Sequence, residues 1–370
     1  MRRPCRAVLP YVLLLQLVAC ATAGPPVVDA PAPDSGFPQL IERLSEQGGF
    51  FPSDNLVSNE TSYLHVLGKM ETLGVRGGVY VGVGPDQNFS YIAAVRPEIA
   101  FIIDIRQDNL LHHLLFKALF ENARNRMEYL TLLLARPVPD DLDGWDEASI
   151  AAIVEHIDSL PRNPATFEEV AARVRTTIAG YGVALSESQY ATIRGIHEMF
   201  FARGLDIRYS LGPRYPTYRR LLRERDLDGR QRNYLAAEES FRFVKELQRR
   251  NRVVPVVGDV AGPHALGAIG REIAARGLAI TVFYVSNVEQ YLMRGGSFER
   301  FAETVAALPH GEGGVMIRSY FGRGNHPWNV PGHISTQLLE PLAGFIAERD
   351  RGGYRSYYDL VTRNVVPLHR

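Results

Sequence analysis

Two glycines and one acidic residue have the types and spacing of a nucleoside-binding site. Gly82 and Gly84 directly follow the apolar run 79–81, which predicts a short strand, and residues 89–95 have a helical pattern. Asp104 lies 20 residues beyond Gly84, where the next apolar run ends. Glycines in such a turn let a ligand approach the backbone, and an acid at the end of the next strand can accept hydrogen bonds from both ribose hydroxyls of an adenosine. The alternative is an ordinary tight turn in which Asp104 binds no ligand.

The residues of this turn favour a ligand without phosphate. A dinucleotide-binding turn would have a third glycine where this chain has Gln87, and Asp86 stands at the expected start of the helix. A pyrophosphate bound there would face a carboxylate, which opposes the attraction of a helix N-terminus for anions. S-adenosylmethionine carries a sulfonium and an ammonium group and no phosphate, so it suits an acidic turn better, and we expect Asp86 to contact this cofactor. Asn88, on the following helix, could line the same crevice or serve the structure alone.

Strands alternate with helices over most of the chain, which predicts an α/β fold with a doubly wound, mostly parallel sheet. Continuous apolar runs indicate strands that are buried on both faces. Besides the first strand, we expect strands at 100–105, 253–257, 279–285 and 314–320, and helices at 37–50, 60–73, 110–136, 234–250, 263–276, 298–308 and 336–348.

The alternation is interrupted between residues 137 and 235, where only helical patterns and loops are found. We therefore expect a helical insertion at 137–235 between the two parts of one Rossmann-like domain, 39–136 and 236–370. Ser186 and Gln189 fit a capping box at the start of one of its helices. Helices are expected within the insertion at 146–160, 166–179 and 186–202.

Four segments resemble the class I S-adenosylmethionine-dependent methyltransferase fold. They are VYVGVGPD (79–86), FIIDIR (101–106), VVGD (256–259) and VFYVSNVEQYL (282–292). The resemblance covers roughly residues 60–110 and 240–320. It implies that Gly82 and Gly84 flank the methionine part of the cofactor, that Asp104 holds the ribose, and that Asp259 lies by the adenine.

The chain departs from the methyltransferase pattern at two points. Asp86 stands where the family has its third glycine, and the Asn/Asp-Pro-Pro-aromatic motif of amino-group methyltransferases is absent. Segments GVGPDQNFSYI and FYVSNVEQYL also resemble a family of uncharacterised bacterial lipoproteins, which implies no particular chemistry. Methyl transfer is therefore one hypothesis, and a domain that keeps the fold but only binds a ligand is another.

Polar residues after the fourth expected strand are the candidates for catalysis. The resemblance implies that Asn287 faces the acceptor, and Glu289 and Tyr291 follow it closely. A carboxylate and a phenol at the carboxyl end of a strand could orient or deprotonate an acceptor. Alternatively, Glu289 caps the following turn and Tyr291 packs. Arg106, next to Asp104, could contact the ligand or pair with that acid.

The first 20 residues have the pattern of a bacterial lipoprotein signal peptide. Arg2, Arg3 and Arg6 precede an apolar run that is too short to span a bilayer, and the run ends in Leu17-Val18-Ala19-Cys20. This resembles a lipobox, which implies lipidation of Cys20. Residues 21–38 are rich in proline and small residues and suit a tether. Ordinary secretion with cleavage after Ala21 or Ala23, and a start of translation inside the segment, remain alternatives.

The bulk composition excludes several classes of function. The chain has 370 residues, 46% of them apolar, with 41 basic and 41 acidic side chains, so nothing in its charge favours nucleic acid or anionic lipid. Its two cysteines, Cys5 and Cys20, leave no thiol for chemistry in the remaining body. We expect a protein of the cell envelope that touches the membrane only through its lipid anchor. Its protein partner is not indicated.

The compartment and the cofactor conflict in this interpretation. S-adenosylmethionine is made in the cytoplasm, so a methyltransferase outside it would lack its donor. The body could have lost methyl transfer and retained binding, or it could use another small ligand in the same crevice. The favoured prediction is an exported lipoprotein that binds a small ligand or an envelope partner, and an active methyltransferase with an unknown small acceptor is the alternative.

No metal site is expected. His326, His333 and Glu340 recur every seven residues, but two of them fall in a loop and the third in an expected helix, and zinc sites need closer spacing. His197-Glu198 lacks the second histidine of a helical zinc motif, and no Gly-x-Ser-x-Gly turn of a serine hydrolase is present.

Overall fold

A six-stranded sheet forms the centre of the computed structural model, which describes residues 36–322 and 325–368. The strand order is β3-β2-β1-β4-β5-β6, and all neighbouring pairs are parallel except β5 and β6. The strands cover Val79–Gly82 (β1), Ile99–Asp104 (β2), Val253–Val257 (β3), Ile280–Ser286 (β4), His310–Tyr320 (β5) and Thr336–Pro341 (β6). The predicted α/β class with a mostly parallel sheet is confirmed, and the order of the strands around β1 is that of Rossmann-like folds.

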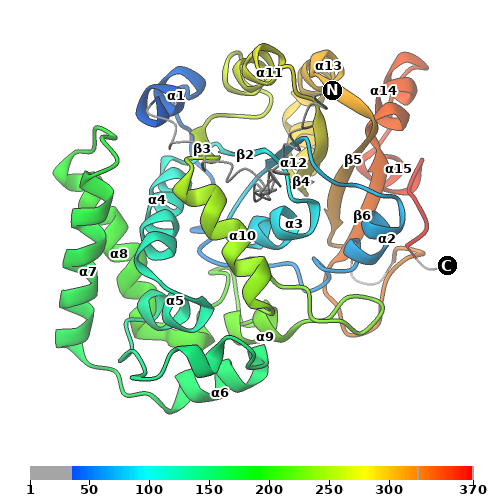
Figure 1. Cartoon of the computed structure of the whole chain (residues 1–370). Coiled ribbons are helices and arrows are strands. Elements are labelled where there is room, and N and C mark those ends of the chain that lie inside the picture. Colours follow the sequence, from blue (N-terminus) through cyan, green and yellow to red (C-terminus); the bar gives the residue numbers. More distant parts are fainter. Residues whose placement is uncertain (1–35, 323–324, 369–370) are drawn as a thin grey trace, which may run out of the picture. The chain divides into compact units, whose positions relative to one another are not determined.

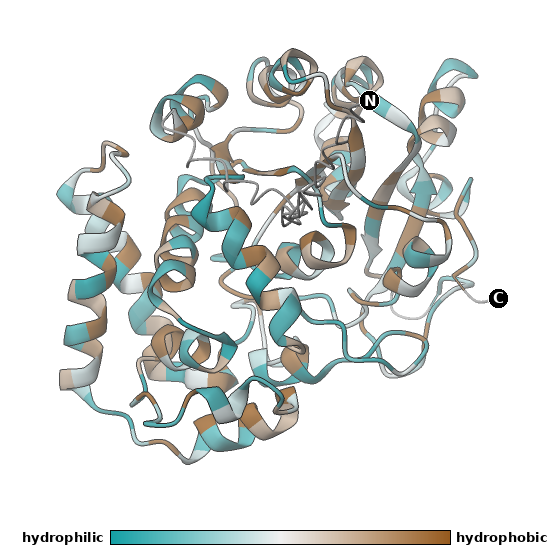
Figure 2. Ribbon diagram, viewed as in Figure 1, coloured by the Kyte–Doolittle hydropathy of each residue, from teal (hydrophilic) through white to brown (hydrophobic). Residues whose placement is uncertain are grey.

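Strands β1, β2 and β3 are apolar because helices cover both faces of the sheet at these strands. Every residue of β1 and β3 is buried, and β2 is buried up to Asp104. Figure 2 shows the same strands in brown between helices that turn teal surfaces outward. Pro255 is tolerated in β3 because that strand pairs on one side only, with β2. The sheet interior is therefore the main hydrophobic core.

Helices cover both faces of the sheet, as a doubly wound fold requires (Figure 1). On one face, α3 packs on β1, α4 packs on β2 and β3, and α10 packs on α3 and α4. On the other face, α1 packs on β3 and α11, and α11, α13 and α14 follow one another across the sheet. These helices are Phe37–Leu44 (α1), Gln87–Val95 (α3), Gln107–Asn122 (α4), Glu238–Arg249 (α10), Ala265–Ala275 (α11), Phe298–Ala307 (α13) and Leu342–Asp350 (α14).

The segment 137–235 contains helices and loops that pack around α4 and α5. Helices α7 and α8 contact α4, and α6 and α8 contact α5. The capping box is confirmed: the hydroxyl of Ser186 accepts from the backbone N–H of Gln189, whose side chain accepts in return. Helix α5, which precedes the segment, is Arg126–Leu133. The helices of the segment are Ile150–Ser159 (α6), Pro164–Ala179 (α7), Glu187–Arg203 (α8) and Tyr218–Arg223 (α9), and 3-10 turns lie at Asp143–Trp145 and Gly204–Asp206.

Two predicted helices are wrong as drawn. The expected helix 110–136 is broken because Asn125 caps a new helix: its side chain accepts from the N–H of Glu128 at 3.0 Å. The expected helix 336–348 is a strand as far as Pro341 and a helix only after it, since proline starts a helix better than it continues one. The strand half extends the sheet as its antiparallel edge.

Other boundaries also differ from the prediction. Helix α1 ends at Leu44, before residue 50, and begins at Phe37, inside the expected tether. Helix α2 is limited to Leu67–Thr72, because residues 61–66 form turns. Three short helices had not been expected, α9 (Tyr218–Arg223), α12 (Val288–Gly295) and α15 (Tyr357–Thr362).

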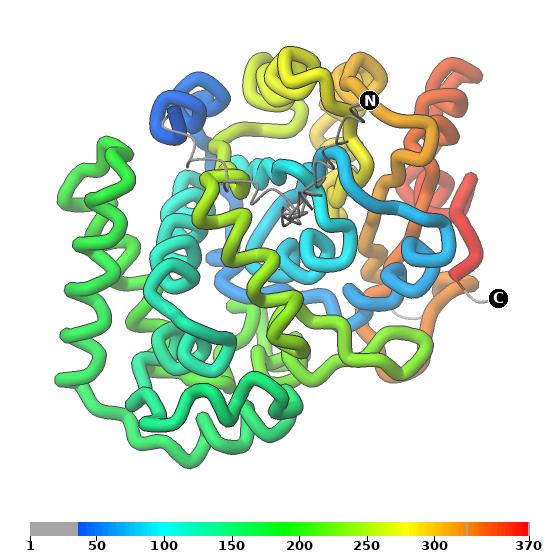
Figure 3. The backbone as a smooth tube through the Cα atoms, in the orientation of Figure 1, coloured from blue at the N-terminus to red at the C-terminus, as the bar shows by residue number. Residues whose placement is uncertain are grey.

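The path between α1 and α2 matters for the site. In Figure 3 the blue tube leaves α1 at one end of the sheet and reaches α2 at the other, so residues 45–66 cross the molecule in irregular backbone. The expected signal peptide at 1–20 and most of the expected tether lie outside the described residues. Within the described part, no helix is both long and apolar enough to cross a bilayer.

Candidate functional site

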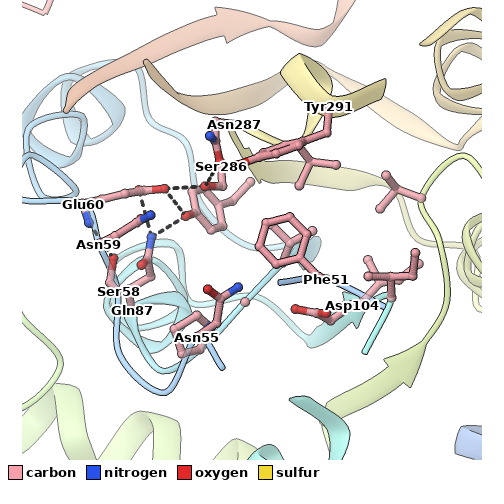
Figure 4. A pocket seen from close by; sticks show the side chains of 18 of the residues that line it. Phe51, Asn55, Ser58, Asn59, Glu60, Gln87, Asp104, Ser286, Asn287 and Tyr291 are labelled. Atoms are coloured by element: carbon pink, nitrogen blue, oxygen red, sulfur yellow. Dashed lines mark hydrogen bonds between the residues drawn. The ribbon is translucent and has the colours of Figure 1, made fainter. Parts of the chain in front are cut away.

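A cavity of about 450 Å³ lies at the carboxyl ends of β1, β2, β3 and β4. This is the edge of the sheet where ligands bind in open α/β folds, and the size is ordinary for a small-molecule site. The crossing segment 50–60 closes the cavity on its remaining side and supplies about a third of its lining. Figure 4 shows the cavity with side chains that line it, Glu60 and Gln87 among them.

The glycine turn follows β1 at the floor of the cavity. Gly84 lines the cavity and has a φ of +83°, a conformation that favours glycine, with open space where a Cβ would stand. Gly82 is a glycine for a different reason, since a Cβ there would lie 2.1 Å from Oδ1 of Asn88. The side chain of Asn88 donates to the carbonyls of Val83 at 2.9 Å and Pro85 at 2.7 Å. Asn88 therefore holds the turn from beneath and does not line the cavity, so the structure does not support it as a ligand contact.

His113 on α4 fixes the same turn from the other side. Its Nε2 lies 2.9 Å from the carbonyl oxygen of Gly84, so this nitrogen carries the proton and donates. Burial lowers the pKa of His113 to about 4, which leaves the ring neutral near pH 7. The turn is thereby held in one conformation without placing a charge beside the cavity.

Asp104 lines the cavity at the end of β2 and is paired with Arg106. The guanidinium donates to Oδ1 at 3.2 Å and to Oδ2 at 3.1 Å, and the N–H of Arg106 donates to Oδ1 at 2.9 Å. Arg106 itself is buried and also donates to the carbonyls of Ser53 and Asp54. A carboxylate has about four acceptor positions, so one position on Oδ2 stays free for a ligand hydroxyl. Arg106 is thus a support for Asp104 and does not itself line the cavity.

Asp259 lines the cavity at the end of β3, next to the start of α11. Its Oδ1 accepts from the N–H of Ala261 at 2.9 Å. The N-terminus of α11 is occupied by the side chain of Glu46, which accepts from the N–H groups of His264 at 2.9 Å and Ala265 at 3.2 Å. A helix N-terminus that could have bound a phosphate is therefore already filled by a carboxylate of the chain.

Asp86 does not reach the cavity. It is 4% exposed and accepts hydrogen bonds from the hydroxyls of Tyr218 at 2.9 Å and Tyr234 at 3.1 Å, both of which come from the region after α8. Burial raises the pKa of Asp86 to about 6. The prediction that Asp86 contacts a cofactor is corrected accordingly: it joins the glycine turn to the helical segment.

The three candidates for catalysis are separated by the structure. Asn287 and Tyr291 line the cavity, and the ring of Tyr291 meets that of Phe51 edge to face at 5.3 Å. Glu289 is fully buried on the opposite side of α12, where it accepts from Arg318 at 2.5 and 3.1 Å. Arg318 also pairs with Glu340 of β6. Glu289 therefore joins α12 to the sheet, and the prediction that it acts on a substrate is wrong.

Sequence reasoning missed Glu60, the most enclosed acid of the cavity. It is 1% exposed and lines the cavity between β1 and β4. Its Oε1 accepts from the hydroxyls of Tyr284 at 2.7 Å and Ser286 at 2.5 Å, and its Oε2 accepts from Gln87 at 3.0 Å (Figure 4). No motif marks residues 51–59, and the helix expected at 60–73 gave no reason for its first residue to face β4.

Aromatic side chains line the outer part of the cavity. Phe50 and Tyr291 are exposed, whereas Tyr209 is nearly buried and comes from the region after α8. The hydroxyls of Ser53 and Ser210 lie 3.4 Å apart and join the two loops at this point. Aromatic rings of this kind can stack on a planar base or contact a cation.

The charge of the lining is one-sided. Three carboxylates line the cavity, and within the described part of the chain no lysine, arginine or histidine side chain does. Arg106 neutralises one of the three from behind. The lining therefore favours a neutral or cationic ligand and opposes an anionic one.

His326, His333 and Glu340, which recur every seven residues in the sequence, lie outside the cavity. Nε2 of His326 lies 2.9 Å from the carbonyl of Val361, His333 packs its ring on His65 at 4.4 Å, and Glu340 pairs with Arg318. Among residues 36–322 and 325–368, no group of three or more potential ligands is arranged to hold a metal ion.

Comparison with known proteins gives one family. A family model described as a domain of unknown function (DUF7790) matches residues 56–156 and 164–346, which together cover more than half of the chain. No curated protein matches the chain. The matched residues include all six strands and most of the cavity lining.

Proposed function

The chain belongs to the DUF7790 family of domains of unknown function, and we propose that its cavity binds a phosphate-free adenosine ligand, of which S-adenosylmethionine fits best. The observation that carries the proposal is the joint placement of Gly84 and Asp104, at the ends of β1 and β2, in one cavity that no basic residue of the described part of the chain lines. In this proposal the domain is methyltransferase-like in its fold and serves first as a binding protein.

Electrostatics separate this ligand from a nucleotide. Two unit charges about 6 Å apart interact by about 3 kcal/mol at an effective dielectric constant of about 20. A diphosphate would meet such a repulsion from each carboxylate that Arg106 does not neutralise. The N-terminus of α11 could not compensate, because the carboxylate of Glu46 already occupies it. A sulfonium or an ammonium group would be attracted to the same carboxylates by a similar interaction energy. The sign of the lining therefore favours S-adenosylmethionine over NAD or ATP.

Each part of the ligand has a counterpart in the lining. The free acceptor position on Oδ2 of Asp104 suits one ribose hydroxyl, and the open space at Gly84 lets the ligand lie against the backbone. Asp259, at the end of the neighbouring β3, suits the exocyclic amino group of adenine, which donates hydrogen bonds. The aromatic residues at the mouth can cover the base.

Calorimetric titration of the full chain tests the proposal. S-adenosylmethionine and S-adenosylhomocysteine are expected to bind, whereas ADP and NAD at the same concentrations are expected not to. Equal binding of the phosphate-bearing ligands, or binding of none of the four, would overturn the proposal.

Methyl transfer is a second candidate, favoured by the polar groups at the end of β4. Asn287 and the hydroxyl of Ser286 reach the same cavity as Asp104, so an acceptor could lie beside the donor. Incubation with methyl-labelled S-adenosylmethionine and a panel of small acceptors would show label in product. Saturable binding without turnover across the panel would leave the binding role alone.

We also propose that the protein is exported and anchored to the cell envelope through Cys20, on the strength of the four lipobox residues 17–20. An exported position separates the protein from the cytoplasmic supply of S-adenosylmethionine, so the exported protein would take another small ligand in the same cavity. Labelled palmitate is expected to enter the membrane-bound protein and to be absent from the Cys20→Ala variant. Unlabelled, soluble wild-type protein would end the lipoprotein hypothesis.

A further inference from the structure

Glu60 has the surroundings of a site for a positively charged group. It is buried, it lines the cavity, and within the described residues it makes no ion pair. A buried carboxylate without a counter-charge is costly, so proteins usually pair it. Here the space in front of Glu60 is the cavity itself, which means that a ligand can supply the missing charge.

The hydrogen bonds around Glu60 hold it as an acceptor. The hydroxyls of Tyr284 and Ser286 and the amide of Gln87 all donate to it, an arrangement that suits the ionised carboxylate. Gln87 also donates to the hydroxyl of Tyr284, so the tyrosine accepts from one neighbour and donates its only proton to Glu60. Three of about four acceptor positions are filled, and the fourth, on Oε2, remains for a donor from the cavity.

Figure 4 places this network on one side of the cavity and Asp104 on the other, with Phe51 drawn between them. The aromatic rings of Phe51 and Tyr291 border the space between the two acids. A carboxylate combined with aromatic faces is a common environment for organic cations. The two acids thus divide the cavity into a half for the nucleoside and a half for a cation.

We propose that Glu60 binds a protonated amine of the ligand. The inference deepens the proposed function, because it specifies the charged end of what the same cavity takes. The ammonium group has two possible sources: the amino-acid end of an S-adenosylmethionine-type ligand, or a separate small amine that binds beside the nucleoside.

The test compares ligands that differ only in this group, by calorimetry on the full chain. S-adenosylhomocysteine has the ammonium group, and 5′-methylthioadenosine has the same nucleoside thioether without the amino-acid end. Phenethylamine is compared with 2-phenylethanol, which has a hydroxyl in place of the amine. The variants are Glu60→Gln, with Glu60→Asp as the charge-retaining variant and the exposed Glu98→Gln as the control.

If the ammonium belongs to the nucleoside ligand, Glu60→Gln lowers the affinity for S-adenosylhomocysteine at least tenfold and changes the affinity for 5′-methylthioadenosine less than twofold. Phenethylamine then competes with S-adenosylhomocysteine for the cavity. If the ammonium belongs to a separate small amine, phenethylamine binds alongside S-adenosylhomocysteine. Its affinity then falls at least tenfold in Glu60→Gln. Glu60→Asp restores part of either loss, and Glu98→Gln leaves both affinities unchanged.

The proposal is overturned if no ammonium-bearing ligand depends on Glu60, or if 2-phenylethanol binds wild type as tightly as phenethylamine. The comparison of amine with alcohol on wild type needs no variant and so survives a Glu60→Gln protein that does not fold. Failure of the proposed function gives a different result, since methylthioadenosine then does not bind at all.

Discussion

Asp86 is a buried acid whose ionisation makes the stability of the fold depend on pH. Folding raises its pKa from 3.8 to about 6, so the protonated form is favoured in the folded state. Its contribution to stability is therefore greatest below pH 4 and is lost as the pH rises through 6. The full loss amounts to about 3 kcal/mol.

We predict that Asp86→Asn stabilises the protein at neutral pH. Asparagine cannot ionise, and its carbonyl oxygen can still accept from Tyr218 and Tyr234. Urea unfolding at pH 7.5 should show a gain of about 1–3 kcal/mol that shrinks to about a third of that size at pH 4.5. The exposed Asp108→Asn serves as the control. A gain of equal size at both pH values would contradict the assigned role of ionisation.

The two glycines of the turn after β1 are predicted to differ in what they tolerate. Gly82→Ala places a Cβ 2.1 Å from Asn88, whose movement would release the carbonyls of the turn, and should cost about 2–4 kcal/mol of stability. Gly84→Ala has free space and pays only for its positive φ, about 1 kcal/mol. Urea unfolding of both variants measures the difference, and equal losses would contradict this account of the turn.

Helix α12 and the antiparallel edge of the sheet are joined by Arg318. Its guanidinium is 1% exposed and pairs with Glu289 of α12 and Glu340 of β6. We predict that Arg318→Met costs about 3–5 kcal/mol, because two carboxylates stay buried without their positive counter-charge. Denaturant unfolding measures the loss. The surface pair Arg173–Glu169 provides the control, since Arg173→Met should change stability by less than about 1 kcal/mol.

At the scale of elements, the sequence predicted best where burial dictates residue type. Strands β1 to β4 are continuous apolar runs because both faces are covered, and the prediction was close at each of them. It failed at 336–341, where the mixed polar and apolar segment TQLLEP suits a strand or a helix and only pairing with β5 decides. The break at Asn125 was a local signal, an asparagine cap, that the apolar pattern on both sides concealed.

The candidate site was predictable only where it follows strand ends. Gly84, Asp104, Asp259 and Asn287 all reached the cavity because the carboxyl ends of parallel strands meet at one edge. Glu60 was missed because a crossing loop brings it there, and Glu289 was misassigned because α12 turns it away from the cavity. Which face of a helix a side chain occupies depends on tertiary packing, and α12 itself had not been predicted.

At the scale of the whole molecule, the helical segment and the sheet form one body. The described residues, 36–322 and 325–368, belong to a single compact unit, and the contacts of Tyr218 and Tyr234 with Asp86 run through its interior. We predict one cooperative thermal transition by calorimetry and no release of residues 137–235 by limited proteolysis. Two transitions, or a stable excised segment, would show that the insertion is an independent domain.

The central claim is that Asp104 and the glycine turn hold a phosphate-free adenosine ligand, and one affinity measurement tests it most directly. We would titrate S-adenosylhomocysteine into the full chain and into Asp104→Ala, with the exposed Asp108→Ala as the matched control. The account predicts saturable binding to wild type and to the control, weakened at least tenfold in Asp104→Ala. Equal binding to all three proteins, or no binding to wild type, would contradict it.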